Sequence, residues 1–74
     1  MNKNWHLTIF LEDLIGDLDK TFWDNNLPDW VMKQNGGINA NWYIHNETEG
    51  REMVAKAKAA GVQMVGYHIE EIPF

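Results

Sequence analysis

The sequence lacks cysteine and serine altogether among its 74 residues. Without cysteine there can be no disulfide and no thiolate zinc site, two devices that often stabilise a domain this small. Nucleophilic catalysis would then depend on Thr8, Thr21 or Thr48, and no motif supports any of them. We therefore expect one globular domain over residues 1–74, without catalytic activity, cofactor or metal. Its stability should come from close packing or from oligomerisation.

Positive charge is also scarce. The chain has 6 Lys and Arg residues against 11 Asp and Glu residues, for a net charge of −5. Because binding a phosphate backbone needs clustered Lys and Arg, we expect no direct nucleic-acid partner. No segment approaches the roughly 18 apolar residues of a membrane span, and residues 1–4 lead into no secretory signal. These absences predict a cytoplasmic protein with no membrane partner.

The second half of the chain has the clearest pattern, a strand, a helix and another strand. Residues 38–45 contain the aromatic and β-branched types that favour a strand. Asn46 is a typical helix N-cap and Glu49 completes a capping box, so a helix is predicted over 47–60. A glycine ends that helix, and residues 62–69 form the next strand. A helix of this length rises roughly 21 Å and returns the chain along the sheet. The two strands should therefore be parallel, either adjacent or with a third strand between them.

The first half allows two interpretations. Apolar residues recur at helical spacing over 7–22, whereas residues 5–11 alternate between apolar and polar types as a strand does. We favour a strand over 4–11, then a helix from about residue 12 to Asn25. A short helix should begin at Pro28 and end at the turn 35–37. The helical alternative would leave a two-stranded core. The favoured fold is a small α/β domain (α+β being possible) in the order β-α-β-α-β, a three-stranded sheet with its helices packed on one face.

Alternation along the predicted strands divides the sheet into two faces. The helices should cover the apolar face, formed by Trp5, Leu7, Ile9, Leu11, Trp42, Ile44, Val65, Tyr67 and Ile69. The open face takes His6, Thr8, Phe10, Asn41, Tyr43, His45, Met64, Gly66, His68 and Glu70. This mixed aromatic and polar face favours binding, either of a partner or of a second copy of the chain. All 3 histidines lie on it, but their spacing is not the short spacing typical of metal ligands, so a histidine metal site is the weaker interpretation.

Acidic residues gather in the segment 12–29. On the predicted helix, Asp13, Asp17 and Asp24 lie on one side. Such a patch favours contact with a basic partner surface, for example one that holds DNA or RNA. The alternative is an ordinary solvated helix face. Trp23 is a binding hot spot if it is exposed, and a core residue otherwise.

These features predict a non-catalytic protein-binding module, and they are compatible with a homodimer. The expected partner-binding residues are Asp13, Asp17, Asp24, Trp23, Phe10, Tyr43, His45 and His68. In size and charge the chain resembles phage and mobile-element inhibitors of host defence, such as anti-CRISPR proteins, and that resemblance implies that it blocks a basic partner surface. The alternative is an oligomeric protein that binds and sequesters a small ligand or nucleotide. It would use Trp, Tyr and His for stacking, with a local site built by Arg51, Lys56 and Lys58.

Overall fold

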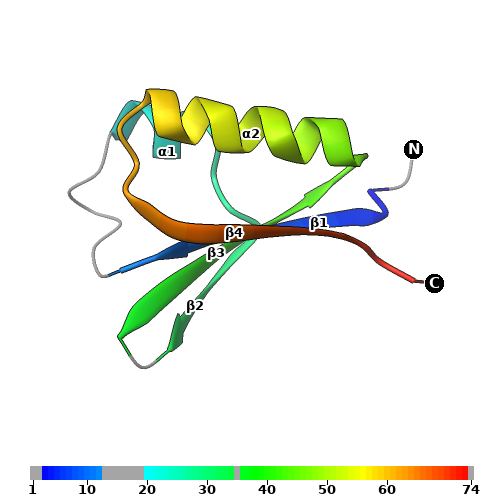
Figure 1. Ribbon diagram of the computed structural model, residues 1–74, viewed down its shortest axis with the longest axis horizontal. Helices are drawn as coiled ribbons and strands as arrows, with labels where there is room; N and C mark the ends of the chain where they lie inside the picture. The colour runs from blue at the N-terminus through cyan, green and yellow to red at the C-terminus, as the bar shows by residue number, and fades with distance from the viewer. Residues whose placement is uncertain (1–2, 13–19, 35, 74) are drawn as a thin grey trace.

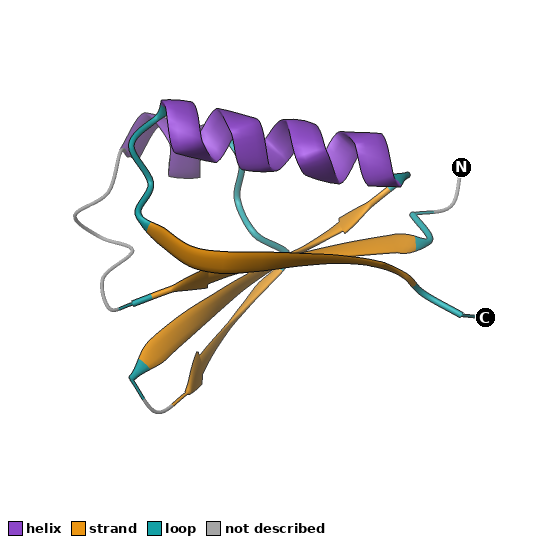
Figure 2. Ribbon diagram, in the orientation of Figure 1, coloured by secondary structure: helices purple, strands orange, loops and turns teal. Residues whose placement is uncertain are grey.

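The computed structural model describes residues 3–12, 20–34 and 36–73, and within them it has four strands and two helices (Figure 1). In chain order these are β1 (Trp5–Leu11), α1 (Lys20–Asn25), β2 (Trp30–Gln34), β3 (Gly37–Ile44), α2 (Glu47–Ala59) and β4 (Met64–Glu71). The strands form one sheet in the order β2-β3-β1-β4, and every neighbouring pair is antiparallel. Both helices lie on the same side of this sheet (Figure 2). The element order is that of the split β-α-β, or ferredoxin-like, motif.

The predicted three-stranded sheet is wrong, because residues 30–34 form a strand and not a helix. This segment pairs with β3 from Trp30 opposite Asn41 to Gln34 opposite Gly37. Only two residues separate β2 from β3, and their sequence, Asn-Gly, is the strongest short signal for a β-hairpin. Gly36 has a φ of 75°, as such a turn requires. The domain is therefore α+β, with a four-stranded antiparallel sheet.

The position of β1 decides between the alternatives left open above. Residues 5–11 form a strand, so the long helix over this segment is wrong. β1 lies between β3 and β4 and is antiparallel to both, so β3 and β4 run parallel to each other. This arrangement confirms the alternative with a third strand between them. The helix predicted from residue 12 is observed over Lys20–Asn25, and residues 13–19 lie outside the described part of the chain.

The core lies between the sheet and the two helices. β1 and β3 supply Leu7, Ile9, Leu11, Ile38, Ala40, Trp42 and Ile44, and the rest of the chain adds Phe22, Trp23, Val54, Ala57 and Val62. Trp23 of α1 stacks on Trp42 of β3, with ring centroids 6.2 Å apart. The predicted apolar face is thus confirmed for the inward residues of β1 and for Trp42 and Ile44.

For β4, part of the predicted face is wrong. The register shifts between Phe10 and Leu11, so that Met64 lies opposite Leu11. Met64 therefore packs against the core, whereas Val65 is 68% exposed. One irregular step in an edge strand changes which side chains point inward.

Helix α2 begins and ends as its sequence predicts. Asn46 adopts an extended backbone, and its side chain accepts a hydrogen bond from the backbone N–H of Glu49 at 2.8 Å. At the other end Gly61 has a φ of 87°. The N–H groups of Gly61 and Val62 donate to the carbonyls of Lys58 and Ala57, which is a Schellman motif. Both ends of the helix are therefore capped.

A glycine lets α2 approach the sheet closely. Gly50 is buried, and a Cβ at this position would lie 2.8 Å from Ile44 Cδ1 and 3.0 Å from Ile69 Cδ1. Both distances are shorter than a normal contact between carbon atoms. The absence of a side chain at residue 50 therefore leaves room for the Ile44 and Ile69 side chains between the helix and the sheet.

Replacement of Gly50 by Ala tests this contact. Ala favours a helix over Gly by about 1 kcal/mol, but overpacking a filled site costs about 1–3 kcal/mol. We expect Gly50→Ala to lower the free energy of unfolding by about 1 kcal/mol net, measured by urea denaturation. Ala55→Gly, at an exposed position of the same helix, is the control for helix propensity alone. A more stable Gly50→Ala variant would contradict the close contact.

Candidate binding site on the open sheet face

The face of the sheet opposite the helices forms three rows of side chains. The strand registers place Tyr43, His6 and Glu70 in the first row, Trp30, Asn41, Thr8 and His68 in the second, and Met32, Asn39, Phe10 and Gly66 in the third. We call this set the open face. It contains no Lys and no Arg, and Glu70 is its one carboxylate. Most of the open face was predicted from alternation, but Trp30, Met32 and Asn39 were not.

The centre of the open face is a hydrogen-bonded polar group. Thr8 and Asn41 are only 7% and 4% exposed. The Thr8 hydroxyl donates to Asn41 Oδ1 at 2.9 Å, and the Asn41 amide donates to the Asn39 carbonyl at 3.2 Å. His6 Nε2 lies 2.9 Å from the same Oδ1, so this nitrogen carries the proton that it donates. These bonds fix the position of the side chains at the middle of the face.

Aromatic rings lie beside this polar centre. His6 stacks on Trp30 with ring centroids 5.1 Å apart and an angle of 10° between the planes. Tyr43 lies against Trp30 with centroids 5.1 Å apart at 46°. We call His6, Trp30 and Tyr43 the aromatic cluster. Tyr43 is 46% exposed, and the neighbouring Phe10 and Met32 are 38% and 45% exposed. Exposed aromatic and Met side chains around a rigid centre are typical of the core of a protein interface.

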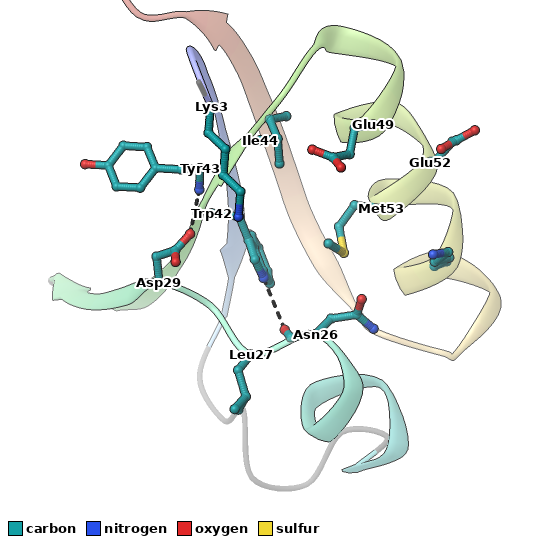
Figure 3. Close-up of a pocket in the computed structure, with 11 residues that line it drawn as sticks. Lys3, Asn26, Leu27, Asp29, Trp42, Tyr43, Ile44, Glu49, Glu52 and Met53 are labelled. Atoms are coloured by element: carbon teal, nitrogen blue, oxygen red, sulfur yellow. Dashed lines mark hydrogen bonds between the residues drawn. The ribbon is translucent and has the colours of Figure 1, made fainter. Parts of the chain in front are cut away.

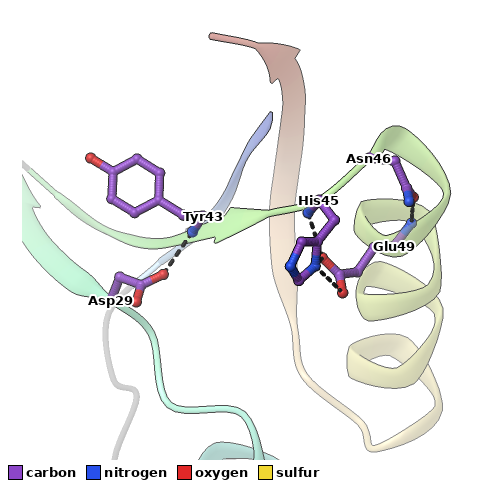
Figure 4. Close-up of polar contacts among 5 residues, drawn as sticks. All are labelled: Asp29, Tyr43, His45, Asn46 and Glu49. Carbon is purple, nitrogen blue, oxygen red and sulfur yellow. Dashed lines mark hydrogen bonds and ion pairs between the residues drawn. The ribbon is translucent and has the colours of Figure 1, made fainter. Parts of the chain in front are cut away.

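The sheet has a notch at the end of β3. Strand β2 begins at Trp30, opposite Asn41, so in the described part of the chain residues 42–44 have β1 as their only neighbouring strand. Two carboxylates accept the hydrogen bonds that a further strand would take (Figure 4). Asp29 Oδ2 accepts from the backbone N–H of Tyr43 at 2.6 Å, and Glu49 Oε1 accepts from that of His45 at 2.7 Å. Carboxylates in these positions prevent another strand from pairing with this edge.

Glu49 also interacts with the His45 ring, whose Nδ1 lies 3.3 Å from both carboxylate oxygens. The backbone N–H of His45 is the main reason why the pKa of Glu49 is below its ordinary value of 4.5. The ring of His45 and the charge of Lys3 act in the same direction. His45 therefore belongs to the start of α2 and not to the open face.

A pocket of about 330 Å³ lies at the notch, between the sheet edge, α2 and the segment before β2 (Figure 3). Its lining residues are Lys3, Asn26, Leu27, Asp29, Trp42, Tyr43, Ile44, Glu49, Glu52, Met53 and Lys56. The Trp42 indole N–H donates to the Asn26 carbonyl at 3.1 Å, which holds the segment after α1 against the pocket. Tyr43 belongs both to this pocket and to the aromatic cluster. The lining mixes carboxylates, ammonium groups and apolar surface, and it selects no single ligand chemistry.

The structure brings some of the predicted partner-binding residues together and separates others. Phe10, Tyr43 and His68 share the open face, and His68 Nε2 lies 2.6 Å from Glu70 Oε1. Trp23 is buried at 6% exposure and serves the core, which was its alternative role. Asp24 is exposed on α1, on the helix side of the sheet. Asp13 and Asp17 lie outside the described residues.

The residues of the predicted ligand site are all on α2. Lys56 lines the pocket, and Lys58 is exposed. Arg51 forms an exposed ion pair with Glu47 at 2.7 Å, and this hydrogen bond raises the pKa of Arg51. The structure therefore places Lys56 at a cavity, while Arg51 is engaged along its own helix.

Of the residues that sequence reasoning missed, Asn39 lies on a segment predicted as a strand, whereas Trp30 and Met32 belong to the segment predicted as a helix. The Asn-Gly pair after it was the signal that would have placed them on a strand. The three histidines do not meet: the described residues contain no group of three or more His, Cys, Asp or Glu side chains placed to hold a metal ion.

No protein-family model, curated protein or solved structure matches this chain. Among the described helices, none has the length and apolar character needed to cross a membrane.

The carboxylate at the start of α2 gives a prediction about pH. A carboxylate whose pKa is lowered in the folded protein stabilises the fold above its ordinary pKa, and this contribution is lost as the pH falls through the lowered value. We expect the free energy of unfolding of Glu49→Gln to fall less than that of the wild type as the pH is lowered below about 5. Urea denaturation at several pH values measures this. Glu52→Gln, on the exposed side of the same helix, is the control for loss of charge. Identical pH profiles for wild type and Glu49→Gln would contradict the role of the two His45 contacts.

The polar centre of the open face gives a second prediction. Thr8→Val keeps the shape of the side chain but removes a donor to the buried Asn41 Oδ1. Because loss of such a bond leaves a buried acceptor less well satisfied, we expect the variant to lose about 1 kcal/mol of unfolding free energy. Thr48→Val, at an exposed position in the first turn of α2, is the control. Equal stabilities of the two variants would show that the network does not stabilise the face.

Proposed function

We propose that the chain is a non-catalytic binding module whose open face covers a surface of a protein partner. The observation that carries this proposal is the exposure of Phe10, Met32 and Tyr43 around the hydrogen-bonded centre, on a face that neither helix covers. Aromatic and Met side chains are enriched in the cores of protein interfaces. A rigid centre also lowers the entropy lost when a partner binds. The cytoplasmic location expected from the sequence is part of this proposal.

Charge defines the kind of partner. The chain carries a net charge of −5, and the open face has no Lys or Arg. A partner with a basic surface would be attracted at long range, whereas an acidic partner would be repelled. Blocking such a surface, for example one that holds DNA or RNA, is the mechanism implied by the resemblance in size and charge to phage and mobile-element inhibitors. In this proposal Asp24 contributes attraction at a distance, and the open face makes the contact.

The aromatic cluster favours a second candidate, a binding protein for a small planar ligand. His6, Trp30 and Tyr43 offer rings for stacking, and the amide of Asn41 lies beside them. The absence of Lys and Arg from this face is unfavourable for phosphorylated ligands. An unphosphorylated ring is therefore the ligand class that this candidate would take.

Site-specific photo-crosslinking tests the leading proposal. A benzophenone amino acid is placed at Phe10 on the open face or at Tyr67, which is 43% exposed but lies opposite Ile9 on the helix side. Each protein is irradiated in an extract of the cells in which the chain is naturally made. We expect a discrete heterologous adduct from residue 10 and none from residue 67. Equal labelling from both positions, or no adduct from residue 10, would overturn the proposal.

Two other results would assign the face differently. A covalent homodimer formed through residue 10 would show that the open face binds a second copy, and the partner proposal would fall. A non-covalent passenger seen by native mass spectrometry of the isolated protein, and lost in Tyr43→Leu, would establish the small-ligand candidate in its place.

A further inference from the structure

Tyr43 is the exposed ring of the aromatic cluster and is open to a planar group, whereas His6 and Trp30 are half-buried. The His6 ring stacks on the Trp30 indole, so it covers one of the two faces of Trp30. Tyr43 is tilted by 46° against Trp30 and is 46% exposed, so its ring is not stacked flat on its neighbour. The two larger rings thus form an angle at the surface. A flat group from outside can contact a ring face there without moving the polar centre.

The electrostatics around the cluster favour a cation. The faces of aromatic rings carry negative potential, and none of the open-face residues is Lys or Arg. The carboxylate of Asp29 lies at the backbone of Tyr43, one residue before Trp30. Lys3, the nearest ammonium group in sequence to β1, belongs to the helix-side pocket, and in Figure 3 its side chain extends along Trp42. The ring faces of the cluster therefore present negative potential, and the described residues of that face include no Lys or Arg to neutralise it.

Among cations, a guanidinium fits this site better than an ammonium. It is planar, it is more weakly hydrated than an ammonium, and it stacks on aromatic faces. A phosphate would find no Lys or Arg on the open face to pair with. We propose that Tyr43, beside the half-buried Trp30, receives an arginine side chain of the protein partner, which stacks on the exposed ring of Tyr43. This inference rests on the proposed function, and it names the group by which a basic partner is recognised.

The test compares short peptides that differ in one chemical property. The probes are the capped tetrapeptide Gly-Arg-Arg-Gly, the same peptide with citrulline, which is planar but uncharged, and the same peptide with lysine, which has equal charge but no planar group. Binding to the full chain is followed by two-dimensional NMR at the Trp30 indole N–H and the Tyr43 amide. We expect the arginine peptide to bind about fivefold more tightly than either of the others.

Two variants show whether the preference for the arginine peptide depends on the aromatic cluster. Tyr43→Leu should remove the preference for arginine, whereas Tyr67→Leu, which changes a tyrosine of similar exposure on the other side of the sheet, should keep it. Unfolding curves of both variants show whether they are folded. If Tyr43→Leu unfolds, Tyr43→Phe, which keeps a ring face, should bind the arginine peptide as the wild type does.

The outcomes separate this inference from the proposed function. Equal binding of the arginine, lysine and citrulline peptides, or an arginine preference that survives in Tyr43→Leu, would overturn the arginine site. If crosslinking through residue 10 still captured a specific partner, the proposed function would stand without it. Tighter binding of adenosine than of the arginine peptide would instead favour the small-ligand candidate and would overturn the inference.

Discussion

The alternation of side chains along β1 is the constraint on which the rest of the structure depends. This strand is central in the sheet, and its inward residues Leu7 and Ile9 are fully buried. Because neighbouring residues of a strand point to opposite faces, burying these two fixes His6, Thr8 and Phe10 on the open face. The two strands that pair with β1, which are β3 and β4, add further residues to the core and to the open face. A shift of one residue would expose the core and bury the polar centre together, so the core and the binding face are specified by the same register.

The edges of this small sheet show a second constraint. A four-stranded antiparallel sheet leaves two edge strands whose backbone groups can pair with other chains. At the notch beside β3, Asp29 and Glu49 occupy two backbone N–H groups. At the other edge, β4 carries an irregular register and ends in Glu70 and Glu71. These features hinder strand pairing at the notch and along β4.

How far the sequence predicts this arrangement depends on how local the signals are. The helix α2 was predicted closely because its caps are local: Asn46 at one end and the glycine after its last turn at the other. The faces of β1 and β3 followed from alternation over several residues. Residues 30–34 were assigned wrongly because Pro28 suggested a helix start, and only pairing with β3, together with the Asn-Gly turn, makes them a strand. That error removed Trp30 from the predicted site, so the aromatic cluster was not predicted.

The composition of the open face also limits what kind of binding it supports. A face made only of residues like Phe10 and Met32 would associate with any apolar surface, which is a hazard for a small soluble domain. Here the Thr8 hydroxyl donates to the Asn41 side chain, whose amide donates to the Asn39 carbonyl, so this polar centre needs no hydrogen bond from a partner. The surface that a partner meets is then mostly aromatic, with the one carboxylate, Glu70, towards the edge. Contact by stacking and by charge depends on the chemistry of the partner more than apolar burial does, so under the proposed function this face would distinguish partners by their chemistry.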